Sequence, residues 1–217
     1  MKNKFLILFL IFSTVIFSQK KAIKKFQTTA NEIEISTIGL DDFVLENTES
    51  SFIEIFLYAE NPNERHIVFE EKQGVANIKF NIAEFKTEET VFRKFITKRL
   101  QRASAIVKIP KGKKTTIFGE NINIASKSYQ GSLAIFIEKG NVKLNTVQET
   151  TQVNLYSGNV YATLKNTNID VISRIGKIKI DNILKEKVYQ KKNDIFKNTF
   201  TVHTIKANVL LTSLKTQ

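Results

Sequence analysis

His66 and His203 are the chain's two histidines, so they are the first candidates for acid–base or metal chemistry. His203 lies in the alternating stretch FTVHTIKANV, where it shares a strand face with Thr201 and Ile205. A metal site needs several convergent ligands, and the sequence contains no H-x-H or H-x-x-x-H spacing. No G-x-S-x-G motif supports a Ser–His–acid triad, although spacing alone does not exclude one, because triads assemble in space. We interpret His203 as a satisfied or solvent-facing strand histidine and expect no metal site.

Acidic residues are the next candidates, because some β-helix proteins cleave polysaccharides with carboxylates arrayed along one face. In the regular stretch 131–182 the acids to test are Glu138, Glu149, Asp170 and Asp181. Paired catalytic carboxylates lie about 5 to 9.5 Å apart, and these four occupy different columns of the repeat described below. No G-x-x-x-x-G-K-[ST] or G-x-G-x-x-G motif indicates a nucleotide site. We therefore expect no catalytic residues and no cofactor; a polysaccharide-active envelope enzyme on a β-helix scaffold is the alternative.

Positive charge is concentrated between Lys86 and Lys114, a segment that contains ten Lys or Arg residues and two acidic residues. The candidate anion-binding patch in this segment consists of Arg93, Lys94, Lys98, Arg99 and Arg102. Its partner would be an anionic glycan, lipopolysaccharide, a membrane surface or another envelope protein. The alternative is a solvated face without a partner. Nucleic acid is not expected, because no aromatic stacking platform accompanies the charge.

A nine-residue repeat runs through residues 131–182, beginning with GSLAIFIEKGNVKLN. Its first position holds glycine in four of six repeats, which gives the candidate structural corners Gly131, Gly140, Gly158 and Gly176. The third position reads Leu133, Val142, Thr151, Val160, Ile169 and Ile178, and the fifth reads Ile135, Leu144, Val153, Ala162, Val171 and Ile180. Alternation over about five residues indicates a half-buried strand, and a regular glycine indicates a bend.

Strands that keep a fixed phase are typical of a β-solenoid, because equivalent residues of successive coils stack on one another. The glycines recur most strictly at every second repeat (Gly140, Gly158, Gly176), so we expect two strands per coil, with columns three and five facing inward. We predict an all-β, single-domain β-solenoid or β-helix of short Gly-cornered strands, each with its corner about nine residues long. The segment KEKVYQKKNDIFKN (185–198) interrupts the phase and is interpreted as a charged excursion.

The N-terminal half contains strand-like segments without the strict phase, at 31–37, 43–47, 50–59, 66–71 and 76–82. Residues 88–102 have helical apolar spacing, with Thr87 as a cap, but 91–98 also reads as a strand. No Pro- or Ser-rich linker separates the halves, so we expect one domain over 31–217, preceded by a basic tail at 19–30.

Segment 1–18 has the pattern of a secretory signal peptide. Lys2 and Lys4 precede the apolar run Phe5–Phe17, which is followed by the small residue Ser18. This run is shorter than the roughly 20 residues of a membrane span. The chain has 217 residues, a formal net charge of +12 and no cysteine, which excludes thiol catalysis and disulfides. We expect an exported protein that is periplasmic, on the outer surface or secreted.

Short G-N-V-x-L rungs preceded by V-K-I-P-K-G (107–112) resemble the bacterial putative-adhesin β-solenoid family of the head-GIN type, as a flavobacterial-type secreted member. The segments GLDDFVLENTESSFIEIFLYA (39–59) and GVANIKF (74–80) are similar to the family's opening strands. The resemblance covers about 31–212 and departs from the family at an insert, 83–103. It implies a non-enzymatic envelope or cell-surface protein with a structural or adhesin-like role and no catalytic residues to transfer.

Glutamine at all five positions of the candidate anion-binding patch tests whether this cluster binds anions. We expect binding to anionic vesicles or lipopolysaccharide to weaken from low to physiological salt, and to be lost in the glutamine variant. The melting temperature should stay nearly unchanged, because solvated charges contribute little to stability. Equal binding by the variant would show that the cluster is only a solvated face.

Overall fold

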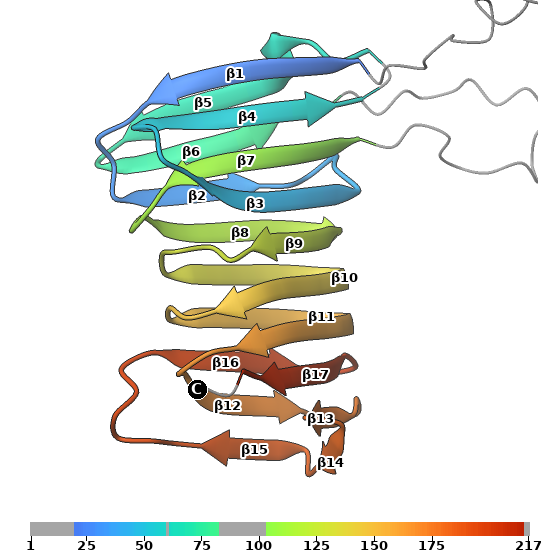
Figure 1. Cartoon of the computed structure of the whole chain (residues 1–217). Coiled ribbons are helices and arrows are strands. Elements are labelled where there is room, and N and C mark those ends of the chain that lie inside the picture. The colour runs from blue at the N-terminus through green and yellow to red at the C-terminus, as the bar shows by residue number, and fades with distance from the viewer. Residues whose placement is uncertain (1–19, 60, 83–102, 215–217) are drawn as a thin grey trace, which may run out of the picture.

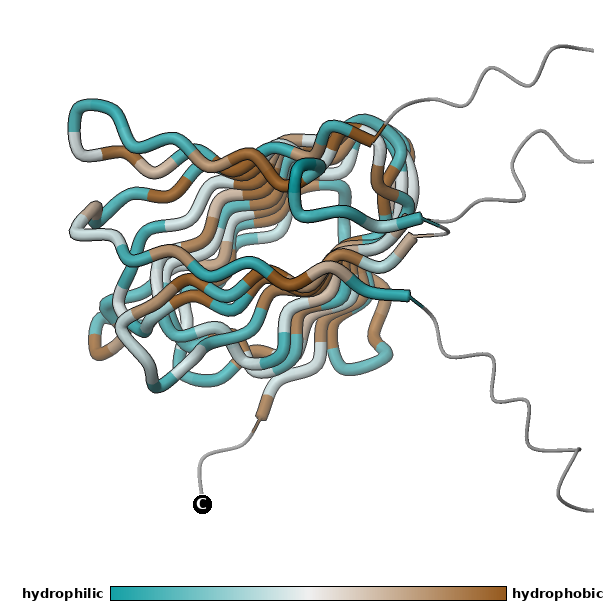
Figure 2. Tube along the Cα trace, turned by 90° about the horizontal axis from the view of Figure 1, so that it is seen from above, coloured by the Kyte–Doolittle hydropathy of each residue, from teal (hydrophilic) through white to brown (hydrophobic). Residues whose placement is uncertain are grey.

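The computed structural model describes residues 20–59, 61–82 and 103–214, and this part of the chain is all-β. Within these residues, seventeen strands form one continuous sheet, and a single 3-10 turn, η1 (Glu64–His66), precedes β5. The strands stack along one axis, and the sheet curls into a nearly closed, barrel-like cross-section (Figures 1 and 2). The expectation of an all-β fold is confirmed.

The sheet forms two facing layers, which we call layer A and layer B. Along the stack, layer A contains β5 (Ile67–Lys72), β6 (Val75–Phe80), β2 (Glu32–Ser36), β8 (Lys114–Asn121), the first half of β10 (Leu133–Val147), the first half of β11 (Thr151–Leu164), β16 (Thr199–Thr204), β12 (Asn168–Ser173) and β15 (Val188–Lys191). Layer B contains β1 (Lys21–Gln27), β4 (Phe52–Tyr58), β7 (Ser104–Pro110), β3 (Asp42–Thr48), β9 (Asn123–Lys127), the second halves of β10 and β11, β17 (Asn208–Ser213), β13 (Ile178–Ile180) and β14 (Ile183–Lys185).

Strands β10 and β11 pair in the register that the nine-residue repeat predicted. Strands β10 and β11 each turn the corner between the layers, and they pair in parallel with Val142 opposite Val160 and Gly140 opposite Gly158, an offset of two repeats. All twelve residues of columns three and five are buried. Figure 2 shows the hydrophobic positions of successive coils lying above one another inside the two layers. Burial of these columns is the main contribution to stability.

The order of the coils differs from the order of the sequence at the C-terminal end. The sequence predicted that the coil at 167–182 would follow β11, but β16 and β17 insert between them (Figure 1). Val160 therefore pairs with Val209, which in turn pairs with Ile178. The other end has the same feature, because β2 and β3 lie between the β6–β7 and β8–β9 coils. The chain inserts a coil near each end.

Antiparallel strands close both ends of the parallel stack. At the N-terminal end β5 and β4 pair antiparallel with β6 and β7, and at the C-terminal end β15 and β14 pair antiparallel with β12 and β13. An aromatic ring with a lysine beside it covers the core at each end. Phe26 stacks on Phe69 at 4.2 Å between centroids, with the Lys24 amine 5.2 Å from the Phe26 ring. The Lys185 amine lies 5.4 Å from the Tyr189 ring.

Residues 21–27 form strand β1, so the prediction of a basic N-terminal tail at 19–30 is wrong for these residues. Ala22, Lys24 and Phe26 alternate toward the core side of β4, and the Lys24 amine donates a hydrogen bond of 3.0 Å to the Ile67 carbonyl oxygen. The excursion at 185–198 likewise contains β15. The signal peptide at 1–18, the helix near 88–102 and the patch Arg93, Lys94, Lys98, Arg99 and Arg102 lie outside the described residues.

Backbone packing at the corners leaves no room for side chains. Gly140 and Gly158 have φ of 140° and 136°, and a Cβ on Gly158 would overlap the Gly140 carbonyl. A Cβ on Gly140 would overlap the Ile122 carbonyl in the same way, and one on Gly176 would overlap that of Ala207. Gly131 lies against the Lys113 carbonyl. Close approach of a neighbouring backbone thus requires glycine at these positions, and at Gly140 and Gly158 the positive φ favours it as well.

An asparagine ladder follows the corners along the stack. The Asn141 amide donates to Asn123 Oδ1 at 3.0 Å, the Asn159 amide to Asn141 Oδ1 at 2.9 Å, and the Asn208 amide to Asn159 Oδ1 at 3.1 Å. The amides of Asn141 and Asn159 thereby serve as donor to one coil and acceptor to the next. The ladder links neighbouring coils through side chains in addition to the backbone.

Alternating charges cross the outer face of layer B near the N-terminal end. Lys25 pairs with Glu54 at 2.7 Å, and Glu46 lies between Lys127 at 2.6 Å and Lys108 at 3.5 Å. The hydrogen bond from Lys127 and the positive charge of both lysines lower the pKa of Glu46, while partial burial opposes this effect. These pairs join β1 to β4 and β7 to β3 and β9.

Gly158→Ala tests the corner, with Gly112→Ala as its matched control. Gly112 also has positive φ, 79°, but nothing lies within 4 Å of a Cβ there. The control should therefore lower the free energy of unfolding by only about 1 kcal/mol, because it adds backbone strain without a clash. Gly158→Ala adds both, and it should lower the free energy of unfolding by about 3 kcal/mol or more. Denaturant unfolding measures both. Equal losses would show that close approach at the corner contributes nothing.

Glu46→Gln tests the charge pairs through their pH dependence. Because the folded-state pKa of Glu46 is lowered, its contribution is present above the unfolded pKa and is lost as pH falls through the folded pKa. The variant should be less stable than the wild type by about 1 kcal/mol at pH 7, and the difference should vanish in acid. Unfolding at several pH values measures this. Glu70→Gln is the control. Glu70 forms an exposed ion pair with Lys72, so its replacement should change the free energy of unfolding less. A difference that persists in acid would contradict the assignment.

Candidate binding groove

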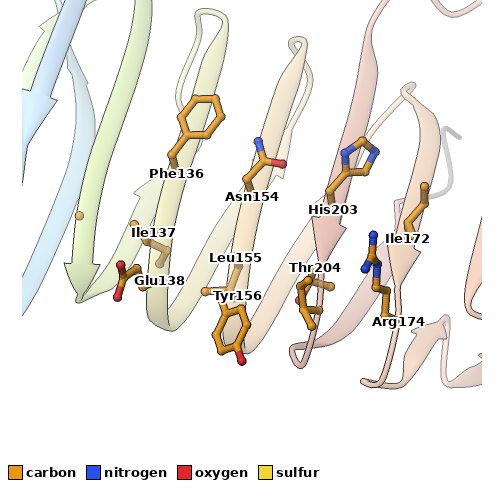
Figure 3. A pocket seen from close by; sticks show the side chains of 12 residues that line it. Phe136, Ile137, Glu138, Asn154, Leu155, Tyr156, Ile172, Arg174, His203 and Thr204 are labelled. Atoms are coloured by element: carbon orange, nitrogen blue, oxygen red, sulfur yellow. The ribbon is translucent and has the colours of Figure 1, made fainter.

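An open groove with a volume of about 580 Å³ lies on the outer face of layer A, across β10, β11, β16 and β12 (Figure 3). Its lining is Gly119, Phe136, Ile137, Glu138, Asn154, Leu155, Tyr156, Ile172, Arg174, His203, Thr204 and Ile205. Strands β10, β11 and β12 follow one another in the sequence, whereas β16 comes from later in the chain and lies between β11 and β12. The inserted coil thus completes the groove.

Two rows of outward side chains form its walls. Cross-strand pairing aligns the first row: Phe136, Asn154, His203 and Ile172. Phe118 on β8, which pairs with Phe136, extends this row beside the groove. The second row lies two residues further along each strand and consists of Glu138, Tyr156, Ile205 and Arg174. Figure 3 shows Phe136, Asn154 and His203 along one side, and Glu138, Tyr156 and Arg174 along the other. Between the rows, Ile137 and Leu155 point into the core.

Aromatic rings stand exposed along the groove. Phe118 and Phe136 stack on each other with centroids 5.6 Å apart, and they remain 42% and 36% exposed. Tyr156 is 44% exposed, and the Lys206 amine lies 5.4 Å from its ring centroid. These faces are available to a ligand because outward positions of a strand do not pack against the core. Exposed aromatic surface on a rigid sheet is typical of a binding site.

Charge is distributed unequally along the groove. Arg174 and His203 lie toward the β12 side, with Lys206 close to Tyr156, whereas Glu138 lies on the β10 side. Glu138 is the one carboxylate among the residues that line the groove. The arrangement can therefore donate hydrogen bonds to an acidic group near β12 and offer ring faces near β10.

The acidic residues considered from the sequence do not come together. Asp170 accepts a hydrogen bond from the Gln190 side chain at 3.2 Å, and Asp181 accepts one from the Ser213 backbone at 2.7 Å. Glu149 lies near Asn198, at 3.4 Å from its amide. Only Glu138 faces the groove. Within residues 20–59, 61–82 and 103–214, no cluster of three or more His, Asp or Glu side chains could hold a metal ion.

The two histidines lie in different places. His66 belongs to the turn η1, where its Nδ1 accepts a hydrogen bond of 3.3 Å from the Asn63 backbone. His203 is exposed in the groove wall. The interpretation of His203 as an outward strand residue agrees with this position, but no sequence pattern indicated its neighbours from β11 and β12.

A buried tyrosine with a perturbed pKa lies elsewhere and has a structural role. Burial raises the pKa of Tyr129 to about 12, although the hydrogen bond from Thr115 opposes this. Its hydroxyl donates to the Lys113 carbonyl oxygen at 2.9 Å and lies 2.8 Å from Thr115 Oγ1. The Tyr129 hydroxyl thus both donates and accepts a hydrogen bond, and these bonds stabilise the chain conformation at the corner.

The groove residues Phe136, Tyr156 and Arg174, and Phe118 beside them, were not identified as a site from the sequence. One signal was present, because Phe118 and Phe136 are separated by two full repeats and therefore occupy the same outward column in successive coils. Arg174 had no such signal, because its neighbours depend on the inserted coil.

No family model matches the sequence, and no curated protein is significantly similar to it. The fold is similar to the crystal structure of a "putative cell adhesion protein" from Clostridium sporogenes, with a TM-score of 0.56 and 14% identity over 92% of this chain and 100% of that one. "Putative adhesin" structures from Parabacteroides merdae and Parabacteroides distasonis align with TM-scores of 0.33 and 0.31, at 10% and 12% identity, over 90% and 91% of this chain and 97% and 98% of theirs. Only the first alignment supports the fold. In the part of the chain that the structure describes, no helix is both long and apolar enough to cross a membrane.

Proposed function

We propose that this chain is a non-enzymatic, exported envelope or cell-surface protein of the head-GIN-like adhesin type, with its strands arranged as a two-strand-per-coil β-solenoid. In this proposal the solenoid is a rigid support, and the groove on layer A is the ligand-binding surface. The fold similarity to the Clostridium structure, named a putative cell adhesion protein, supports the choice of class.

The observation that carries the proposal is the exposed aromatic groove. Phe118, Phe136 and Tyr156 present their rings to solvent although the same strands bury their inward residues almost completely. Exposure of three large aromatic side chains to water in one place is unfavourable. A ligand that covers them removes this surface from water, which favours binding.

The groove favours binding over glycoside cleavage. Hydrolysis of a glycosidic bond ordinarily uses two carboxyl groups about 5 to 9.5 Å apart. The lining supplies one, Glu138, while Asp170 is hydrogen-bonded to Gln190. A polysaccharide-active enzyme on this scaffold would therefore need a mechanism without paired carboxylates.

Saturable binding of the purified protein to envelope fractions, without release of soluble products, tests the proposal. Tyr156→Ala should weaken this binding about tenfold, because it removes exposed ring surface from the groove. Tyr161→Ala is the matched control, since Tyr161 lies on the same strand β11 with 41% exposure but on the outer face of layer B. Equal effects of the two variants, or turnover of the bound material, would contradict the proposal.

A further inference from the structure

We infer that the groove on layer A takes a single chain of an acidic glycan, with sugar rings on Phe136 and Tyr156 and an acidic group at Arg174 and His203. This inference rests on the proposed function and names the chemistry of its ligand. It is carried by the shape of the groove, by the nature of its floor and by the separation of its rings from its cations.

The shape fits one extended polymer chain. From β8 to β12 the first row crosses five neighbouring strands, which span about 19 Å at the strand spacing of about 4.8 Å. The two rows are two residues apart along each strand, which separates them by about 7 Å. A groove of these proportions admits one linear chain along the stack, whereas a folded protein or a bilayer surface would contact only its rims.

The floor excludes recognition of a peptide through its backbone. An extended peptide gains much of its affinity by adding a strand to an open sheet edge. The groove lies on the face of β10, β11, β16 and β12, whose backbone groups already pair with neighbouring strands. Affinity must therefore come from side chains, and the side chains available are ring faces and hydrogen-bond donors. Sugar rings match this set, because their apolar faces stack on aromatic rings while their substituents accept hydrogen bonds.

The charges indicate an acidic glycan. His203 on β16 and Arg174, directly after the adjacent strand β12, are exposed in the two walls, so they face the same part of the groove. Lys206 adds a third basic group beside Tyr156. Glu138 lies at the other end, near Phe136 in the sequence and on the opposite wall (Figure 3). A planar guanidinium is suited to bind a carboxylate or sulfate through two hydrogen bonds.

Calorimetric titration of the purified protein with three hexasaccharides tests the inference: oligogalacturonate as a carboxylated chain, a heparin fragment as a sulfated one, and maltohexaose as a neutral one. At least one acidic chain should bind, and maltohexaose should bind at least about tenfold more weakly. Affinity for the acidic chain should fall as salt rises.

Arg174→Gln should weaken the acidic chain about tenfold or more and leave maltohexaose unchanged. Arg65→Gln is the matched control, because Arg65 is an exposed arginine in η1, at the other end of the stack. Thermal melts establish that both variants fold.

Equal affinities for the acidic and neutral chains, or equal effects of the two arginine variants, would overturn the inference. If no hexasaccharide binds while Tyr156→Ala still weakens binding to envelope fractions, the glycan assignment is wrong and the proposed function stands. If an acidic chain binds and is cleaved, the non-enzymatic function is wrong and the assignment of the ligand stands.

Discussion

Contact between backbones at the corners of successive coils governs the geometry of the central stack. Gly158 lies directly against the Gly140 carbonyl, and Gly140 lies against that of Ile122. This approach keeps neighbouring strands at hydrogen-bonding distance on both sides of the corner, so the strands have the same offset in layers A and B. The asparagine ladder at Asn141 and Asn159 holds the same offset through side chains. Once the offset is fixed, every inward column becomes a continuous strip of core and every outward column becomes a row on the surface.

A parallel stack of this kind has two open ends, where core residues and strand edges would meet water or another chain. The molecule covers the core at both ends with an aromatic ring and places a lysine beside it. Lys24 and Lys185 lie on the core-facing side of edge strands, and inward-pointing charges are a known obstacle to edge-to-edge association. Reversal of strand direction at the ends also breaks the repeat that another coil would need in order to continue the stack.

The sequence predicted what depends on local pattern and missed what depends on the choice among equivalent partners. Columns three and five predicted the buried residues, because period-two alternation indicates a strand with one inward face. The phase of two repeats predicted the pairing of Val142 with Val160, because it places these residues at equivalent positions of neighbouring strands. The position of β16 and β17 could not be predicted in this way. Every coil presents a similar aliphatic strip to its neighbours, so the pattern cannot indicate which coil lies next to β11. Strand β1 was missed because its lysines obscure the alternation of Ala22 and Phe26.

Only one half of the candidate groove follows the local repeat, so the sequence could indicate only that half. Its Phe118–Phe136 half follows the phase of two repeats per coil and could have been found as an outward column. Its Arg174–His203 half exists only because a coil from later in the chain separates β11 from β12. The inserted coil therefore has two effects, since it extends the core and places cationic side chains beside an aromatic row. Inward residues are constrained by packing, whereas outward residues on the same strands are free to specify a ligand. This separation of roles allows a structural repeat to carry a binding surface without disturbing its core.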